Sequence, residues 1–546
     1  MLGRLFPSAC LFLCTCLVSA APNAQTESQA EAGSQDSGGA ASQEPQPTFD
    51  IWEFVVEGNT VLPRTAIEKT VYPFLGEDKT ADDVFAAETA LNELYQDRGY
   101  VSVQVYTPEQ NVDEAVVRFE VLEAPVGRNR IVGSRYHDLR RIRKALPSLA
   151  SGEVPHLPTF QQELEALNRR GTDRQVAASL AAGIRPGTVD ADIRVEDQLP
   201  VHGSVEVNDR FSRNTSRIRT VGSLRYTNLW QREHTFGLTY QESPQEPGEI
   251  RVFSFNYSMP LFENNTLFAY AVDSSSDVLA FNDAGAVGII GNGSIYGGRW
   301  IRSLPQTGNL FNSLTVGLDY KTFEDTVAPD AGGGIVTPVS YLKGVVGYGG
   351  LLLGVQPEVR FGLDVHYGLR GIVAREDRFD DKRFQAKPNF LFLTGRLSVA
   401  QNVAKRQQLF ARINGQLTED PLVANEQFTM GGFDSVRGYA ASQALVDYGF
   451  DGSLEYRYAP EFLAMRLPDW VGNPRFDAFV DGALGKIHLA LPGTDSRTEL
   501  ASVGFGMTAT ANPGLISSVY WAMPLIDNND VEAGDSRVHF RLGMQF

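Results

Sequence analysis

The chain has 546 residues, with 66 Asp or Glu against 48 Lys or Arg, so its formal net charge at pH 7 is -18. This charge argues against a nucleic-acid partner, because phosphate binding needs a basic surface. The chain is rich in glycine (52 residues) and in aromatic residues (32 Phe, 19 Tyr and 5 Trp), as is typical of curved strands and aromatic girdles. After residue 20 no run of 18 apolar residues occurs, which excludes helical membrane spans.

The first 48 residues predict a targeting signal and a linker. Arg4 precedes an apolar run over residues 5–18 and small residues at 19–21, the pattern of a secretory signal peptide over residues 1–20. All three cysteines of the chain lie inside this segment. The processed chain would therefore contain no disulfide and no cysteine-ligated metal. Residues 21–48 are rich in Gln, Ser, Ala, Glu and Gly, which predicts a disordered linker too short and polar to hold a pore-plugging helix.

Residues 49–124 predict a compact β-α-α-β-β module. A strand is expected over 52–57 and a first helix over 63–74, with proline in its first turn. A second helix is expected from Thr80, because Thr80 and Asp83 form a capping-box pattern, and Gly99 ends it. Strands over 101–106 and 115–122 complete the module.

The same order recurs over residues 125–199, which predicts a second module of this kind. The expected elements are a strand, two helices and two strands, over 129–132, 139–149, 159–169, 175–181 and 190–195. In each module a helix layer covers only one face of a small sheet. Each module can therefore present an exposed strand edge.

Residues 200–546 predict a transmembrane antiparallel β-barrel of about 16 strands. Segments of about ten residues alternate apolar and polar side chains and are separated by turns or polar loops. In the segment 313–321 one face carries Leu314, Val316, Leu318 and Tyr320, and the other carries Ser313, Thr315, Gly317, Asp319 and Lys321. The apolar face fits lipid and the polar face fits a water-filled lumen. The alternative is a secreted β-sandwich with the aromatic residues inside, and the alternation alone does not separate the two.

The last nine residues form a two-faced strand. One face carries Val538, Phe540, Leu542, Met544 and Phe546. A closed barrel needs such a strand, because its last strand must pair with its first to leave no edge. A carboxyl-terminal aromatic on an alternating strand also resembles the signal by which bacterial outer-membrane barrels are recognised for assembly, here Phe540, Leu542, Met544 and Phe546. An ordinary amphipathic edge strand is the alternative.

A glycine-rich motif over residues 431–439 lies late in the predicted barrel. Its notable residues are Gly431, Gly432, Val436, Arg437, Gly438 and Tyr439. Glycines at both ends permit a tight fold-back, and Arg437 carries a permanent charge. If the loop folds into the lumen, Arg437 needs an inward-facing carboxylate. The candidates are Glu455 and Asp481 on the strands that follow. The alternative is a solvated surface loop.

This motif resembles the Val-Arg-Gly-Tyr/Phe loop of the barrel superfamily that assembles or secretes proteins across the outer membrane. The two preceding modules resemble the polypeptide-transport-associated (POTRA) domains of that superfamily. The turn over residues 183–187 in the second module and residues 257–261 in the barrel also resemble the corresponding segments of such proteins. Two such domains before one barrel are similar to the two-partner secretion transporters of the haemolysin secretion/activation (TpsB) type. That resemblance implies a barrel in the bacterial outer membrane, in contact with its lipid, with both POTRA domains in the periplasm.

The resemblance further implies that the chain exports an unfolded partner exoprotein of the haemolysin or adhesin type without nucleotide hydrolysis. The exoprotein would bind the POTRA edges, for which the expected residues are Tyr95, Val101, Val103, Val105 and Val176. Arg437 would anchor the lumen loop to Asp481, with Phe479 beside it. The family pattern Phe-x-Asp-x-Gly departs here, because the glycine stands at 482, one position early. Barrel-assembly machinery and periplasmic chaperones would be partners during biogenesis.

No catalytic residue, cofactor or metal is expected, since the sequence lacks a zinc motif, a nucleophile elbow and a P-loop. Two alternatives share the predicted fold. One is an assembly factor whose clients are membrane barrels rather than one secreted protein. The other is a passive porin in which the lumen loop is only a constriction.

Overall fold

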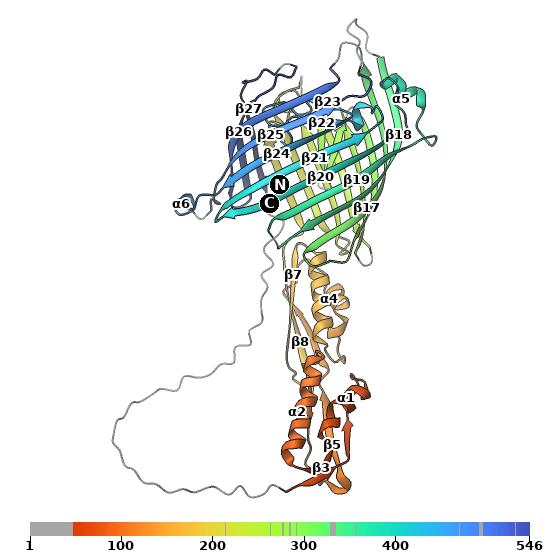
Figure 1. Ribbon diagram of the computed structural model, residues 1–546, viewed down its shortest axis with the longest axis vertical. Helices are drawn as coiled ribbons and strands as arrows, with labels where there is room; N and C mark the ends of the chain where they lie inside the picture. Colours follow the sequence, from red (N-terminus) through yellow and green to blue (C-terminus); the bar gives the residue numbers. More distant parts are fainter. Residues whose placement is uncertain are drawn as a thin grey trace, which may run out of the picture.

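The computed structural model describes residues 47–546 except 213–214, 262–263, 276–277, 283–284, 291, 328–334, 355, 469, 491–494 and 530. The predicted signal peptide and nearly all of the predicted linker lie outside these residues. Two small α/β modules form a stalk that leads to one end of a large barrel (Figure 1). In the described part of the chain, no helix has both the length and the apolar character needed to cross a membrane.

The first module has the predicted β-α-α-β-β order. It contains β1 (Phe49–Ile51), β2 (Glu53–Glu57), α1 (Arg64–Val71), β3 (Gly76–Lys79), α2 (Ala81–Asp97), β4 (Val103–Tyr106) and β5 (Val116–Glu123). Its main sheet has the order β2-β5-β4, which leaves β4 at an edge. Helix α2 starts with the predicted capping box of Thr80 and Asp83. The short strand β3, which pairs with β1, was not predicted, because Gly-Glu-Asp-Lys carries no apolar alternation.

The second module repeats this order. It contains β6 (Val126–Val132), α3 (Leu139–Ala145), α4 (Leu157–Arg170), β7 (Arg174–Ala182) and β8 (Val189–Asp197). Its sheet has the order β6-β8-β7, so that β7 takes the edge position that β4 takes in the first module. The two modules are joined by direct contacts: the backbone N–H of Leu157 donates to the carbonyl oxygen of Gly99 (2.9 Å), and His156 Nε2 lies 2.9 Å from the Arg98 oxygen.

Sixteen antiparallel strands close into a barrel, as predicted. In order around it they are β9 (Val201–Asn208), β10 (Arg219–Leu229), β11 (His234–Glu242), β12 (Arg251–Pro260), β13 (Asn265–Ser274), β16 (Gly293–Ser303), β17 (Leu310–Val327), β18 (Ile335–Leu352), β19 (Glu358–Leu369), β20 (Leu391–Ala404), β21 (Gln407–Thr418), β24 (Tyr448–Tyr458), β25 (Arg475–Lys486), β26 (Arg497–Ala511), β27 (Leu515–Pro524) and β28 (Arg537–Gln545). Strands β14 (Val278–Asn282) and β15 (Gly285–Ile290) form a separate hairpin.

The barrel closes between its first and last strands. Strand β28 pairs with β9 from Arg541 opposite Asn208 to Gln545 opposite Ser204. The pairing continues to Phe546, whose N–H donates to Gly203 O (3.0 Å) and whose carbonyl accepts from Gly203 N–H (2.9 Å). The terminal two-faced strand therefore completes the ring and leaves no edge.

The two faces of the strands point as the sequence predicts. On β17, Leu314, Val316 and Leu318 are exposed on the outer surface. The polar face turns inward, where Asp319 and Lys321 are only 2% and 4% exposed. This arrangement places apolar side chains toward lipid and charged ones toward the lumen, which excludes the sandwich alternative.

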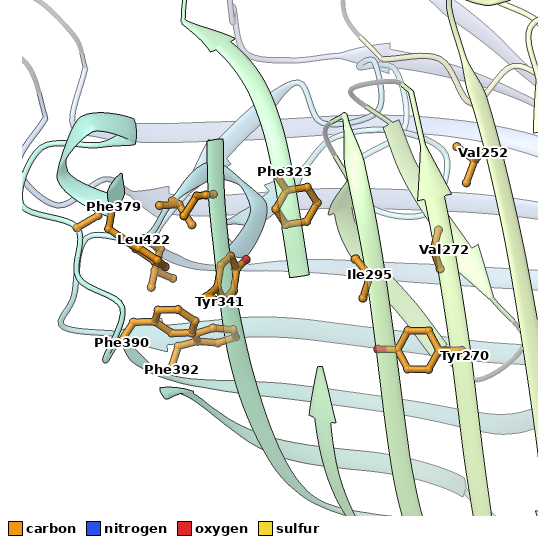
Figure 2. Close-up of a cluster of buried hydrophobic side chains, with 13 residues drawn as sticks. Val252, Tyr270, Val272, Ile295, Phe323, Tyr341, Phe379, Phe390, Phe392 and Leu422 are labelled. Atoms are coloured by element: carbon orange, nitrogen blue, oxygen red, sulfur yellow. The ribbon is translucent and has the colours of Figure 1, made fainter. Parts of the chain in front are cut away.

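The end of the lumen away from the stalk also contains an apolar cluster (Figure 2). Inward side chains of β12 to β20 meet Phe379 from the short helix α5 (Glu376–Lys382), which lies at that end of the barrel (Figure 1). Leu422 and Val423, which follow β21, join the same cluster. The segment that carries α5 is therefore packed into the mouth of the barrel.

Candidate functional site

The connection between β21 and β24, residues 419–447, folds into the barrel and is called the lumen loop here. It contains β22 (Phe428–Met430) and β23 (Ala444–Val446), which form a small hairpin. One part of the loop contacts β17 and β18, and another contacts β24, β25 and β28. Strands β18 and β28 lie half-way round the ring from each other. The lumen loop therefore crosses the lumen between opposite walls and extends well beyond the motif at 431–439.

Arg437 fastens one side of the lumen loop. Its Nε and one terminal nitrogen donate to the two carboxylate oxygens of Asp481, each at 2.7 Å, and its backbone N–H donates to the same carboxylate at 3.1 Å. The guanidinium also contacts Glu455 (2.9 Å) and Ser453 Oγ (2.9 Å). It lies 3.4 Å above the centre of the Phe479 ring. A planar fork with two carboxylates and an aromatic face is a geometry that arginine meets and lysine does not.

The residues around Arg437 fix the shape of the loop. Gly431, Gly432 and Gly438 all have positive φ, between +94° and +99°, a region that favours glycine. Val436 and Tyr439 are fully buried in an apolar cluster against the inner wall of β25 and β26. The Tyr439 hydroxyl donates to the carbonyl oxygens of Ile526 (2.7 Å) and Ala501 (3.1 Å). Every motif residue named from the sequence thus lies inside the barrel.

A second anchor holds the lumen loop to the opposite wall. Glu426 lies between Lys321 of β17 (2.6 Å) and Lys343 of β18 (2.9 Å), and it also accepts a hydrogen bond from the Tyr341 hydroxyl (2.6 Å). The Glu426 side chain is 2% exposed. One carboxylate therefore neutralises two buried ammonium groups, an arrangement that is stable only while all three charges are together.

A third anchor joins the lumen loop to the mouth of the barrel. Arg383, just after α5, donates to both carboxylate oxygens of Asp447 (2.8 and 2.6 Å). The same carboxylate accepts from the backbone N–H groups of Leu422 (3.1 Å) and His488 (2.7 Å). Asp447 is fully buried. The α5 segment and both ends of the lumen loop are therefore fastened to one carboxylate.

The POTRA-like edges differ from the expectation in one respect. Tyr95, Val103, Val105 and Val176 are buried in the module cores, and only Val101 is exposed, in the turn before β4. The outward N–H and C=O of Val105 are bonded to the side-chain amide of Asn92 (2.8 and 2.9 Å). Asn168 bonds Val176 in the same way, at 2.8 Å for both contacts. A partner strand would have to displace these amides to pair at either valine.

Strand β7 has an open edge beyond Val176. In an antiparallel strand, N–H and C=O groups point outward at every second residue, so those of Ala178, Leu180 and Ala182 point outward with those of Val176. Within the part of the chain that the structure describes, strand β7 pairs only with β8. Ser179 and Ala181, which point to the other side, complete this edge segment. The open part of the β7 edge is therefore residues 178–182, in the second module, while β2 and β6 take the opposite edges of the two sheets.

Comparison with known proteins places the chain in a family. Residues 187–453 match the haemolysin secretion/activation protein model ShlB/FhaC/HecB, and residues 49–124 match the ShlB-type POTRA domain. The chain belongs to the haemolysin secretion/activation family. The family predicted from the Val436–Tyr439 motif and the two modules is thus confirmed, and with it an outer-membrane barrel whose POTRA domains lie in the periplasm.

The relatives are outer-membrane transporters. CdiB of Escherichia coli is 26% identical over 184 residues, which span 33% of this chain and 30% of the relative. CdiB of Dickeya dadantii is 22% identical over 510 residues, 92% of this chain and 87% of the relative. The solved structure of CdiB from Escherichia coli superposes with a TM-score of 0.60 at 19% identity, covering 94% of this chain and 93% of that one.

The Arg437 side of the site could be predicted from the sequence, whereas the anchors at Glu426 and Asp447 were not predicted. Glu426, Asp447 and Arg383 lie in loops with no regular pattern. A signal existed for the second anchor, since Lys321 and Lys343 fall on inward positions of their strands, where a buried ammonium needs a carboxylate. Among the described residues, no group of three or more His, Cys, Asp and Glu side chains could hold a metal ion.

One buried carboxylate of the second POTRA domain, Asp173, fixes the domain to the barrel, and another, Asp197, fixes the turn that leads into α3. Asp173 is hydrogen-bonded to Thr227 of β10 and to His202 of β9. Burial alone would raise the pKa of Asp173, but these hydrogen bonds outweigh it and hold the pKa below its usual range. Burial likewise acts to raise the pKa of Asp197, and hydrogen bonds from the backbone N–H groups of Tyr136 and Arg135 lower it further than burial raises it. Both groups are therefore charged at neutral pH.

Proposed function

We propose that this chain exports a polypeptide partner across the outer membrane through its own barrel. The observation that carries the proposal is a closed sixteen-strand barrel whose lumen is crossed by a loop held by buried ion pairs, above a stalk that presents an open strand edge at β7. Family membership supports the same activity. The partner would be an unfolded exoprotein, as expected from the sequence.

Capture would occur by addition of a strand to the β7 edge. Backbone hydrogen bonds to residues 178–182 suit an unfolded client, because β-augmentation recognises the main chain and tolerates varied side chains. The Asn92 amide covers the edge of β4 at Val105, and the Asn168 amide covers the edge of β7 at Val176. Capture along β7 would therefore use residues 178–182. Val101 remains a candidate contact through its exposed side chain. The four buried residues Tyr95, Val103, Val105 and Val176 would act by shaping the edges.

Passage requires the lumen loop to leave its position. The three anchors are electrostatic and hydrogen-bonded, and they can be exchanged one at a time for contacts with the passing chain or with water. No nucleotide is needed if folding of the exoprotein outside the cell prevents its return. During biogenesis, the terminal strand with Phe540, Leu542, Met544 and Phe546 would be the signal read by the barrel-assembly machinery, after delivery by periplasmic chaperones.

The experiment is an export assay with the exoprotein encoded beside this chain. Cells carry the intact chain, Arg437→Ala or no chain, and the exoprotein is measured in the medium, with barrel insertion checked by heat-modifiable gel migration. Export that needs the chain, and that falls with Arg437→Ala while both barrels insert, supports the proposal. Export that is unchanged without the chain rejects the proposal and leaves the two alternatives. Loss of other barrels from the membrane would then favour the assembly factor, and conductance that does not depend on a partner would favour the porin.

A further inference from the structure

Helix α3 of the second POTRA domain is strongly basic in a chain with a net charge of -18. Its sequence is Leu-Arg-Arg-Ile-Arg-Lys-Ala, and Arg140, Arg141, Arg143 and Lys144 are all exposed. Ile142 is fully buried and packs this short helix onto the module core. In the described part of the chain none of the four basic side chains has an ion-pair partner. Folding of the module therefore does not account for these charges.

The start of α3 lies against the periplasmic rim of the barrel. The backbone N–H of Asp138, the residue before α3, donates to the side chain of Gln231 in the β10–β11 turn (3.0 Å). Asn228 and Gln231 both donate to the carbonyl oxygen of Tyr136 (3.1 Å each). Helix side chains lean toward the amino-terminal end, which here is the end at the rim.

The same rim carries side chains typical of a membrane surface. Trp230, in the β10–β11 turn, is 70% exposed, and tryptophan is enriched at the level where lipid headgroups meet hydrocarbon. Tyr136 and Leu139 are exposed beside it. Arg232, two residues after Trp230, is exposed and adds another positive charge. Exposed apolar and basic side chains therefore lie together at this rim of the barrel.

The position of this surface is rigid. The Asp197 carboxylate accepts hydrogen bonds from the backbone N–H groups of Arg135 (2.9 Å) and Tyr136 (2.8 Å) and from Ser134 Oγ (3.2 Å). These bonds fix the turn that leads into α3 relative to the sheet of the module. A rigid basic surface at the rim can hold the module at one height above the membrane.

We propose that the first turns of α3 and the β10–β11 turn form a binding surface for the headgroups of anionic phospholipids in the periplasmic leaflet. Phosphate groups would pair with Arg140, Arg141, Arg143 and Lys144, while Trp230 enters the interface. The contact sets the angle between the stalk and the membrane, and so the path from the β7 edge to the barrel. The inference rests on the barrel lying in the outer membrane and stands whether or not the proposed export is correct.

The test is hydrogen exchange of the full chain in nanodiscs, compared between purely zwitterionic phosphatidylcholine and a mixture containing phosphatidylglycerol. Exchange of residues 135–145 should slow by about fivefold or more in the anionic discs, the effect expected of one basic side chain at an anionic surface. The slowing should disappear in high salt, which screens the contact. Equal exchange in both kinds of disc overturns the proposal without any variant.

A charge-matched pair of variants identifies the surface. Arg140→Gln with Arg141→Gln and Arg143→Gln should abolish the lipid effect. The control changes three exposed basic residues of the first module, Arg64, Lys69 and Arg98, to Gln and should retain it. If α3 is insensitive to lipid but is protected by the soluble exoprotein, the surface binds protein and the lipid proposal is wrong.

Discussion

The Glu426 anchor gives the sharpest quantitative prediction, through the substitution Glu426→Gln. Glutamine keeps the shape of the side chain and removes its charge. Lys321 and Lys343, 4% and 8% exposed, then face each other without a counterion between them. Removing one partner of a buried ion pair costs about 3–5 kcal/mol, because the remaining charge stays desolvated. The hydrogen bond from Tyr341 can persist, which favours the lower end of this range.

A loss of about 3 kcal/mol changes an equilibrium by roughly 10²-fold. If the lumen loop exchanges between a closed and a displaced position, Glu426→Gln should raise the displaced fraction by about that factor. Planar-bilayer recordings should show a matching rise in open time. Hydrogen exchange of residues 424–430 should accelerate in the same variant, while exchange in the barrel strands should not change.

The matched control removes all three charges at once, with Lys321→Met, Lys343→Met and Glu426→Gln together. Replacing a whole buried charge cluster with neutral residues is often close to neutral in stability. This variant should therefore recover much of the closed population, which a double-mutant analysis would report as a coupling energy. If Glu426→Gln alone gives wild-type conductance and wild-type exchange, the ion cluster does not hold the loop and the reasoning is refuted.

Four further predictions concern other parts of the site. Arg437→Lys keeps the charge but loses the fork onto Asp481, so loop exchange should accelerate, by about 1.5–3 kcal/mol for each lost charged hydrogen bond; unchanged exchange would show that charge alone suffices. Gly432→Ala should destabilise the loop more than Gly534→Ala in urea titrations, because both have positive φ but only the Cβ at 432 would lie 2.8 Å from Ala441 Cα, whereas 534 has nothing within 4 Å; equal midpoints would contradict this. Leu180→Pro, which removes one outward N–H of β7, should reduce exoprotein binding well below Leu180→Ala, which loses the same packing but keeps the N–H; equal binding would exclude this edge. The pKa values of Asp173 and Asp197 are held low in the folded state, so the stability that these carboxylates add to the fold is present above about pH 4 and is lost as the pH falls further. Hydrogen exchange of residues 134–138 should therefore rise only in acid. The variant Asp197→Asn should show fast exchange of these residues already at pH 7.

The fold could be predicted because each part of it depends on a regular pattern. The period of two over residues 313–321 identifies a strand with one lipid face, and the terminal alternation ending at Phe546 identifies the strand that closes the ring. The capping box at Thr80 places the start of α2 within one residue. These features are local in sequence, so no knowledge of distant contacts is needed to recognise them.

The lumen loop could be predicted only in part, because its anchors join residues far apart in sequence. Arg437 and Asp481 were paired through the family resemblance, whereas Glu426 meets lysines 83 and 105 residues away. The POTRA edges show a different limit. Alternation identifies β4 and β7 as strands, but whether an edge is free depends on Asn92 and Asn168, single helix residues with no pattern of their own.

One measurement tests most directly whether a polypeptide passes through this barrel past the lumen loop. Ala441 of the loop forms a backbone bridge with Ser212 beside the first strand, which places their Cα atoms within reach of a disulfide. Export of the exoprotein is measured for the Ser212→Cys, Ala441→Cys double variant before and after reduction, with each single variant as control. If the polypeptide passes the lumen loop inside the barrel, export stops when the disulfide forms and returns when it is reduced. Undiminished export with the disulfide fully formed would contradict passage by this route.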